Sequence, residues 1–270
     1  MAIIENSIEA LAQRIDDGSK LAIFKDCGVP VTLGRELIRQ QRRELHIVTV
    51  PTGSMLIDMM IGAGCVGTVE TSGVSLGEFG LAPRFIEAVR SGSVRVLDAT
   101  CPAVYAGLQA AEKGIPFMPL RGLLGTDVLK YRDDFQVIDN PFADTADPIV
   151  CLPAIEPDFS LLHCPLGDRF GNLYIARQPE FKLLAHAAKH TLATVEQIVD
   201  FNLLEDERYA AATLNALYVD AIAEAPGGAR PLNLPGHYAL DRAAVTAYAQ
   251  AAKTLEGFNN WLAVDLSAAA

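Results

Sequence analysis

Long apolar runs, paired cysteines and an excess of basic charge are all missing from this 270-residue sequence. No hydrophobic stretch approaches the roughly 18 to 20 residues needed to span a bilayer, so we expect no transmembrane segment. The five cysteines are widely spaced and form no CxxC pair. This spacing favours buried structural thiols in a reducing cytoplasm.

Acidic residues outnumber basic ones, and the formal net charge is −11. Such a balance argues against a nucleic acid or an anionic membrane as the main partner, although a local loop can still bind a small anion. Residues 1–17 are acidic and amphipathic, unlike a signal peptide or an Arg-rich transit peptide. We therefore predict a cytoplasmic protein with no nucleic-acid partner and no membrane partner.

Apolar residues make up 50% of the chain, which is long enough for one large domain or two small ones. In the first half, apolar runs with strand character alternate with amphipathic helical patterns joined by short links. This alternation predicts an α/β fold with an open, mainly parallel sheet and helices on both faces. The expected helices are 3–15, 30–38, 55–61 and 83–89, and the expected strands are 20–24, 45–50, 65–70 and 93–97.

The pattern changes after a turn-rich stretch at 141–148. Strands with few helices between them follow, and an Ala-rich helical pattern closes the chain from Leu240 onward. The sequence thus predicts added strands and a helical C-terminus beside the parallel sheet. The expected strands are 149–152, 159–163, 172–176, 191–195 and 217–222, with one helix at 181–189.

Residues 99–127 are the first place to look for a ligand site. A loop and a helix lead to the short apolar stretch 115–118, which is typical of a strand covered on both faces. The loop after it contains Arg121, Gly125 and Thr126, and such loops at the ends of parallel strands bind ligands. Arg121 is a candidate to hold a substrate carboxylate, with a surface ion pair as the alternative.

Two glycine patterns match known motifs but stand in different contexts. GxGxxG at 62–67 follows an expected helix and leads into a strand, the reverse of a dinucleotide site, so we expect no cofactor there. GxSxG at 73–77 does follow a strand, and Asp98 and His163 match the chain order of a hydrolase triad. Because no helix begins directly after Ser75, a ligand-facing loop is favoured and a lone hydrolase stays an alternative.

Histidine and cysteine offer three further candidates. His186 and His190 stand four apart, as a metal pair would, but no third ligand is evident, so we predict a polar helix end and no metal site. His163 is expected to be a half-buried structural histidine. Cys101 stands at a predicted helix start, where a thiolate is favoured, but the sequence places no histidine beside it and we expect a structural thiol.

The second half of the chain contains an ordered set of motifs: DRFGNLY at 168–174, AHAA at 185–188, TLATVEQIV at 191–199, YVDAI at 218–222 and APGGA at 225–229. Earlier stretches fit the same set, at 27–30 and 114–127. In this order the motifs resemble the A (alpha) subunit of family I coenzyme A transferases, especially the glutaconate CoA-transferase-like branch. The likeness extends from about residue 15 to residue 230.

This resemblance implies the fold of CoA-transferases and ribose-5-phosphate isomerase-like proteins, a single alpha-subunit domain over residues 1–270, and a heterodimer or heterotetramer in which the partner is a B (beta) subunit. Coenzyme A or acyl-CoA is a substrate of such enzymes, and no cofactor is tightly bound. In the family the thioester is attacked by a glutamate that usually belongs to the B subunit. This gives an anhydride and then a glutamyl-CoA thioester. No segment of this chain resembles the surroundings of that glutamate, so we expect the nucleophile on the partner.

The role implied for this chain is to shape the acyl pocket from across the interface. The pocket candidates are Phe24, Gly28, Glu70, Ser72, Ser75, Arg121, Gly125 and Thr126. We predict the alpha subunit of a CoA-transferase acting on a small carboxylic or oxo acid. Two alternatives stay open: a non-catalytic subunit that completes the partner's site, and a subunit of a CoA-thioester ring-opening hydrolase. Such hydrolases use an acid near the position of Cys101, and here Asp98 and Glu70 are the nearby acids.

Overall fold

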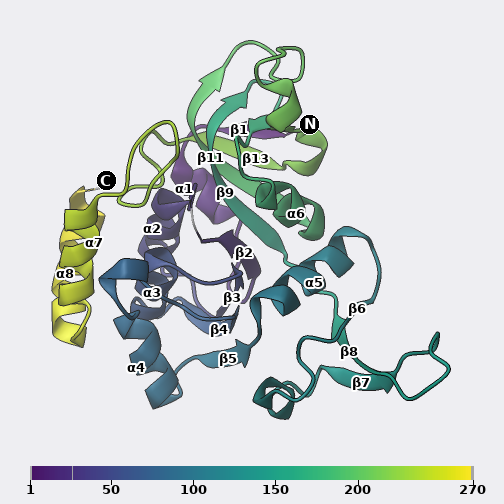
Figure 1. Ribbon diagram of the computed structural model, residues 1–270. Helices are drawn as coiled ribbons and strands as arrows, with labels where there is room; N and C mark the ends of the chain where they lie inside the picture. Colours follow the sequence, from purple (N-terminus) through teal and green to yellow (C-terminus); the bar gives the residue numbers. More distant parts are fainter. Residues whose placement is uncertain (1, 26, 269–270) are drawn as a thin grey trace.

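The computed structural model describes residues 2–25 and 27–268, and a long twisted sheet runs through the molecule (Figure 1). Its strand order is β1-β13-β11-β9-β2-β3-β4-β5, and every pairing along this path is parallel. The open, mainly parallel sheet predicted from the sequence is confirmed. The strands are β1 (Ile3–Glu5), β2 (Lys20–Phe24), β3 (Leu45–Val50), β4 (Val66–Thr71), β5 (Arg95–Asp98), β9 (Phe159–Asp168), β11 (His190–Val199) and β13 (Ala221–Glu224).

Helices cover both faces of this sheet because alternate strand residues point to opposite sides. Leu21 and Ile23 of β2 pack into one apolar core, whereas Ala22 and Phe24 pack into the other. The first core contains the helices α1 (Ile8–Gln13), α2 (Val31–Arg39), α3 (Met55–Gly62), α4 (Pro83–Ser91), α7 (Arg242–Ala251) and α8 (Leu255–Ala268). The second contains α5 (Cys101–Glu112) and α6 (Glu180–Ala187).

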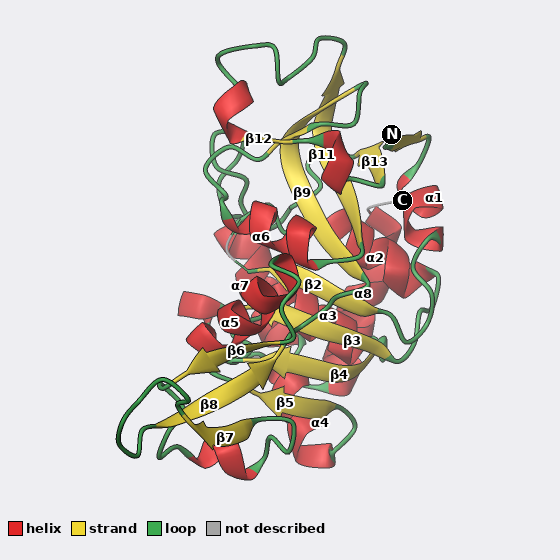
Figure 2. Ribbon diagram, turned by 90° about the vertical axis from the view of Figure 1, so that its right-hand side faces the viewer, coloured by secondary structure: helices red, strands yellow, loops and turns green. Residues whose placement is uncertain are grey.

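A second, smaller sheet is antiparallel, in the order β6-β8-β7, and lies near the β5 end of the main sheet (Figure 2). Its strands are β6 (Phe117–Leu120), β7 (Gln136–Asp139) and β8 (Pro148–Pro153). The prediction that 115–118 forms a parallel strand covered on both faces is wrong, since Phe117 is 44% exposed and β6 is an edge strand. Pro119 within β6 has no N–H for a second neighbour, and so suits an edge.

Two further expectations at the ends of elements need correction. Residues 3–5 form β1, paired in parallel with β13, and the helix begins only at Ile8, after the side chain of Ser7 accepts a hydrogen bond from Ala10 N. The strand expected at 217–222 is instead a 3-10 turn, η4 (Ala216–Tyr218), followed by β13. Residues 3–15 do have apolar residues at helical spacing, but residues 3–5 pair with β13 in the sheet and only Ile8–Gln13 form the helix.

The remaining elements are short. Strands β10 (Leu173–Tyr174) and β12 (Thr213–Leu214) extend the main sheet antiparallel beside β9. Further 3-10 turns are η1 (Gly77–Phe79), η2 (Asp127–Lys130) and η3 (Ala210–Ala212). Among the described residues, no helix has both the length and the apolar character to cross a membrane.

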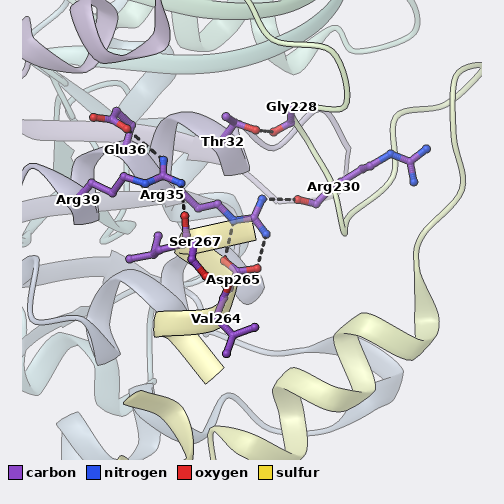
Figure 3. A network of polar contacts seen from close by, with 10 residues as sticks. Thr32, Arg35, Glu36, Arg39, Gly228, Arg230, Val264, Asp265 and Ser267 are labelled. Atoms are coloured by element: carbon purple, nitrogen blue, oxygen red, sulfur yellow. Dashed lines mark hydrogen bonds and ion pairs between the residues drawn. The ribbon is translucent and has the colours of Figure 1, made fainter. Parts of the chain in front are cut away.

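The C-terminal helix α8 is fastened to α2 by charged groups (Figure 3). Arg35 makes a bidentate ion pair with Asp265, with N···O distances of 2.7 and 2.8 Å, and also donates to the carbonyl of Arg230. Arg39 donates to the carbonyl of Leu266 at 2.6 Å. The same helix α2 holds the glycine-rich segment 225–230, because Thr32 donates from its side chain to the carbonyl of Gly228.

Candidate functional site

The loops after β3 and β4 meet at the carboxyl edge of the parallel sheet and are joined by short hydrogen bonds. Gly53 N donates to Gly73 O at 2.8 Å, and Ser75 N donates to Gly53 O at 3.0 Å. The hydroxyls of Thr49 and Thr71 lie 2.6 Å apart in the interior, and Thr71 Oγ1 also donates to Gly73 O. The two strand-end threonines thus fix the backbone of the loops that carry the candidate serines.

Ser72 and Cys101 face each other at this edge. Ser72 Oγ lies 2.8 Å from Pro51 O and 3.2 Å from Cys101 Sγ. The serine has a single hydroxyl hydrogen, which it donates to the carbonyl, so the contact with Cys101 is one in which the thiol donates. Cys101 is exposed at the first position of α5, and its thiol and the serine hydroxyl are therefore presented together.

Ser75 borders a cavity of about 180 Å³ next to this pair of loops. The cavity lies between the loop after β4 and the segment that leads into α7. Its lining mixes polar and apolar side chains: Lys25, Ser54, Met55, Ser75, Leu76, Gly77, Glu78, Phe79, Leu232, Asn233, Leu240 and Val245. Ser75 Oγ accepts a hydrogen bond from Gly77 N at 3.0 Å, and its own hydrogen is available to a ligand.

Glu70 does not line this cavity. Its carboxylate is 2.8 Å from the guanidinium of Arg132 and 3.5 Å from His46 Nε2, and the residues Glu70 and Arg132 are only 3% and 2% exposed. Burial acts to raise the pKa of Glu70, but the contact with His46 and the charge of Arg132 outweigh it and hold that pKa below its usual value. This ion pair links β4 to the segment that follows η2. Arg132 also donates to the carbonyl of Asp98, which links the same segment to β5.

Phe24 and Gly28 shape the loop after β2. Phe24 is buried edge-on to the ring of Phe181, with ring centroids 6.0 Å apart. Gly28 has a φ of +61°, and a Cβ at this position would lie 2.4 Å from the carbonyl oxygen of His163. Only glycine permits this approach of the loop to β9. Phe24 thus packs in the apolar core at the carboxyl end of β2, and the next residue, Lys25, lines the cavity.

Arg121, Gly125 and Thr126 lie in the loop that follows β6 of the small antiparallel sheet. Arg121 forms a bidentate ion pair with the carboxylate of Asp147, and one of its two contacts measures 2.7 Å. Thr126 Oγ1 donates to Leu123 O at 2.8 Å. The surface ion pair that we gave as the alternative role of Arg121 is the contact present. The structure therefore brings together Gly28, Ser72 and Ser75 near one edge, while the loop after β6 belongs to another sheet.

A buried polar network beside this edge was missed in the sequence. His163 is fully buried, with Nδ1 2.8 Å from Thr194 Oγ1 and Nε2 2.7 Å from Glu196 Oε1. Glu196 also accepts from Tyr238 OH at 2.7 Å and from Gly227 N at 2.8 Å. Burial would raise the pKa of Glu196, but the hydrogen bonds from His163, Gly227 and Tyr238 outweigh it and hold that pKa at about 2.

One signal for part of this network does exist in the sequence. Thr194 and Glu196 are two apart in a strand and so share a face, which places two polar side chains next to each other on one side of β11. Tyr238 gives no such signal, because it comes from a loop that is distant in the chain. Gly228 also belongs here, since a Cβ on it would lie 2.6 Å from His163 Cε1.

The other motif candidates are separated by the fold. His186 lies in α6 with its ring stacked on Tyr218 at a centroid distance of 3.9 Å, whereas His190 begins β11 and contacts Asp220. Over residues 2–25 and 27–268, no three His, Cys, Asp or Glu side chains gather as a metal site would require. His163 uses both ring nitrogens on Thr194 and Glu196, so it is not placed to activate Ser75.

A family model and several curated relatives place this chain in the same protein family. The coenzyme A transferase family model matches residues 4–225. The alpha chain of the 3-oxoadipate CoA-transferase of Pseudomonas knackmussii is 28% identical over 263 residues, which is 94% of this chain and 90% of that protein. The cholesterol ring-cleaving hydrolase IpdA subunit of Rhodococcus jostii is 30% identical over 246 residues, which is 88% of this chain and 82% of that one. An uncharacterized protein of Archaeoglobus fulgidus is 31% identical over 92% of this chain, which spans only 56% of its length.

Comparison with solved structures gives relatives with the same fold. A variant of the decarboxylase AibA/AibB superimposes with a TM-score of 0.85 and 29% identity, over 99% of this chain and 100% of that one. Glutaconate coenzyme A-transferase from Acidaminococcus fermentans gives a TM-score of 0.90 at 24% identity, over 97% of this chain and 88% of that one. The α/β fold with an open parallel sheet, a small antiparallel sheet and C-terminal helices is therefore shared.

Proposed function

This chain belongs to the coenzyme A transferase family, and we propose that it is the alpha subunit of an enzyme that moves coenzyme A between an acyl-CoA and a small carboxylic or oxo acid. The proposal is supported by relatives that are the corresponding subunits of a 3-oxoadipate and a glutaconate CoA-transferase. Both act on small acids that carry carboxylates. We further propose that residues 1–270 work as a single alpha-subunit domain in a cytoplasmic enzyme.

The partner in this proposal is a B (beta) subunit, in a heterodimer or a heterotetramer. A glutamate of that subunit would attack the acyl-CoA carbonyl and expel the CoA thiolate, leaving a mixed anhydride. The thiolate then attacks the glutamyl carbonyl of the anhydride, which releases the donor acid as its carboxylate and gives a glutamyl-CoA thioester. The carboxylate of Glu70 is held in a buried ion pair, and that of Glu196 is held in partly buried hydrogen bonds. What this chain presents at the carboxyl edge is the hydroxyls of Ser72 and Ser75 and the thiol of Cys101, which suits a wall of an acyl pocket.

The observation that carries the proposal is the cavity of about 180 Å³ beside Ser75, in a chain that matches CoA-transferase alpha subunits over nearly its whole length. A small cavity with the hydroxyls of Ser54 and Ser75 and several apolar side chains in its lining fits a short acyl group. The hydrogen bonds between the loops at 53 and 73–75 fix the backbone beside Ser75, which preorganises that side of the cavity.

The direct test is an acyl-CoA assay of this chain alone and co-expressed with the product of its neighbouring gene. Transfer to an added acid, release of free CoA and release of CO2 are followed separately. We expect transfer only with the pair, and borohydride applied during turnover should trap the glutamyl-CoA thioester on the partner. Activity of the lone chain, or a CoA adduct on this chain, would contradict the proposal.

Substitution of Ser75 separates a pocket role from that of a non-catalytic subunit. If the hydroxyl touches the reacting acyl-CoA, Ser75→Ala should lower kcat/KM of the pair by about tenfold, or about 1.4 kcal/mol of transition-state binding. Ser91→Ala is the matched control, because Ser91 is an exposed helical serine far from this edge. Equal kcat/KM for both variants would support the scaffold role instead.

A ring-opening hydrolase is the second candidate. The 30% identity to an IpdA subunit favours it, and Cys101 stands exposed at the start of α5 with Asp98 just before. This hypothesis predicts release of free CoA without any acceptor acid, and loss of that release in Asp98→Asn. Transfer that depends strictly on an acceptor would exclude it.

A further inference from the structure

We propose that Tyr238 and Glu196 are positioning residues that fix a hairpin across the cavity beside Ser75 and thereby set which acyl groups the cavity admits. We call residues 232–240 the cavity hairpin. The inference rests on the proposed function for its substrate class, short-chain acyl groups of CoA thioesters. Its structural part, the anchoring of the hairpin, is independent of the reaction.

The cavity hairpin is a tight turn that faces Ser75. Leu234 N donates to Tyr238 O at 3.1 Å and Tyr238 N donates to Leu234 O at 3.0 Å, which closes the turn. Gly236 within it has a φ of +83°, as the reversal of the chain requires. Side chains from both ends of the hairpin, Leu232, Asn233 and Leu240, line the cavity opposite the loop that carries Ser75.

Tyr238 ties this hairpin to the sheet. Its hydroxyl donates to Glu196 Oε1 at 2.7 Å and accepts from Ala229 N at 3.0 Å. Burial, together with the charge and hydrogen bond of Glu196, raises the pKa of Tyr238, so the hydroxyl keeps the proton that it donates. The guanidinium of Arg230 covers the tyrosine ring at 4.5 Å.

Glu196 is a rigid anchor because its own position is fixed on several sides. It stands in β11 and accepts from His163 Nε2, while its second oxygen accepts from Gly227 N. From α2, Thr32 donates to Gly228 O, and Arg35 donates to Arg230 O (Figure 3). The segment 227–230 is thus bound both to the sheet and to α2. Tyr238 connects the hairpin to the sheet through Glu196 and to this segment through Ala229.

Among the described residues, the other hydrogen bonds at the ends of the hairpin run through the backbone, and the side chains of Leu232 and Leu234 are buried in the apolar interior. Gly28 N donates to Asn233 O at 3.3 Å, and Asp241 N donates to Pro231 O at 2.9 Å. Within the described part of the chain, Tyr238 is the one side chain of the hairpin with a hydrogen bond. Loss of its hydroxyl removes this attachment, so the hairpin, with Leu232 and Leu240 at its ends, should gain freedom to move.

A looser wall should change selectivity more than turnover. One methylene in a well-fitted apolar pocket changes relative kcat/KM by roughly 10- to 200-fold. If Leu232 and Leu240 can move away from Ser75, longer acyl groups gain room while the partner's reacting groups stay where they are. The expected signature is a KM change that depends on acyl length, with kcat kept.

The first experiment measures how accessible position 75 is to bulky reagents, and it does not depend on the enzymatic reaction. The thiol introduced by S75C is labelled with N-methylmaleimide and with the much bulkier fluorescein-5-maleimide, and the two rates are compared by peptide mass spectrometry in the assembled pair. Adding Tyr238→Phe should raise the bulky-to-small rate ratio by about fivefold or more, and Glu196→Gln should act in the same direction. The exposed Cys101 serves as an internal reference whose ratio stays constant.

Tyr209→Phe is the matched control, because the Tyr209 ring packs against Tyr174 at 4.9 Å and lies in a different loop. It should leave the ratio at S75C unchanged. An equal ratio in Tyr238→Phe and in the Ser75-substituted parent would overturn the anchoring role. A rise that is matched at Cys101 would also overturn it, since general loosening explains both.

The second experiment uses the Ser75 protein with its partner and the donors acetyl-CoA, butyryl-CoA and hexanoyl-CoA. Tyr238→Phe should lower KM for the longest donor relative to acetyl-CoA by about tenfold, with kcat within about twofold. An unchanged KM ratio would refute the selectivity role even where the maleimide ratio rises. If the unsubstituted pair transfers no CoA from any donor, the proposed function fails, and the maleimide ratio alone decides the anchoring.

Discussion

A single buried guanidinium, that of Arg132, joins the small sheet to the main one. It contacts Glu70 of β4, the carbonyl of Asp98 at the end of β5, and Asp134 beside its own segment. Both Arg132 and Glu70 are almost wholly buried, so neither charge can fall back on water. The contact explains why Glu70, an attractive catalytic acid in the sequence, serves the fold instead.

Arg132→Ala should lower the free energy of unfolding by about 3 to 5 kcal/mol at pH 7, because it removes the closest ion-pair partner of the buried Glu70 carboxylate. Urea unfolding followed by circular dichroism measures this. Arg121→Ala is the control, since its pair with Asp147 is exposed to solvent and should contribute little to stability. Equal losses for the two variants would show that burial of the pair has no effect.

The carboxyl of Glu196 should make stability depend on acid. Its pKa lies at about 2 in the fold, below the value of 4.5 for a free side chain. The unfolded chain therefore takes up this proton first, so the stabilisation is complete above about pH 4.5 and is lost as the pH falls towards 2. The difference in unfolding free energy between the protein and Glu196→Gln should shrink between pH 6 and pH 3. A difference that is constant over this range would contradict the network.

At the scale of elements, α8 is held on α2 by the fork of Arg35 (Figure 3). Lysine cannot bind both oxygens of Asp265 and the carbonyl of Arg230 at once, so Arg35→Lys should lower stability by about 1.5 to 3 kcal/mol despite the kept charge. Amide exchange in residues 255–268 should rise with it. Arg208→Lys, in an exposed pair with Asp206, is the matched control and should change neither measurement.

Most elements of the parallel sheet could be predicted from the sequence because strand and helix periodicities differ clearly. The apolar strand 45–50 and the amphipathic helix from Pro30 are examples, and both are present as β3 and α2. The stretch 115–118 could not be placed, because a short apolar run reads the same in a parallel strand and in an edge strand. Residues 3–5 failed for a related reason, since their partner β13 is far away in the chain.

Some of the site residues could likewise be predicted from the sequence, and others could not. Gly28, Ser72 and Ser75 come directly after predicted parallel strands, so their meeting at one edge follows from the fold class. Arg121 was misplaced together with its strand. Tyr238 and Glu196 lie in separate segments that only the folded chain brings together, and no spacing in the sequence encodes their contact.

At the scale of the whole molecule, the two apolar cores share the strands of one sheet. Loss of either core would expose one face of the same strands, so both should unfold together. The single tryptophan, Trp261, packs against Tyr248 on one face, and the thiol of Cys164 is buried in the other. Trp261 fluorescence and pulse alkylation of Cys164 should give the same urea midpoint. Two separate midpoints would show two independently stable layers.

The crowding around His163 has a practical meaning for directed evolution. Its carbonyl oxygen and its ring lie 2.4 and 2.6 Å from where side chains on Gly28 and Gly228 would begin. Libraries that randomise these glycines will consist mostly of misfolded members. Codons 233 and 240 encode half-buried side chains that line the cavity, and diversity introduced there should return folded variants with altered substrate range.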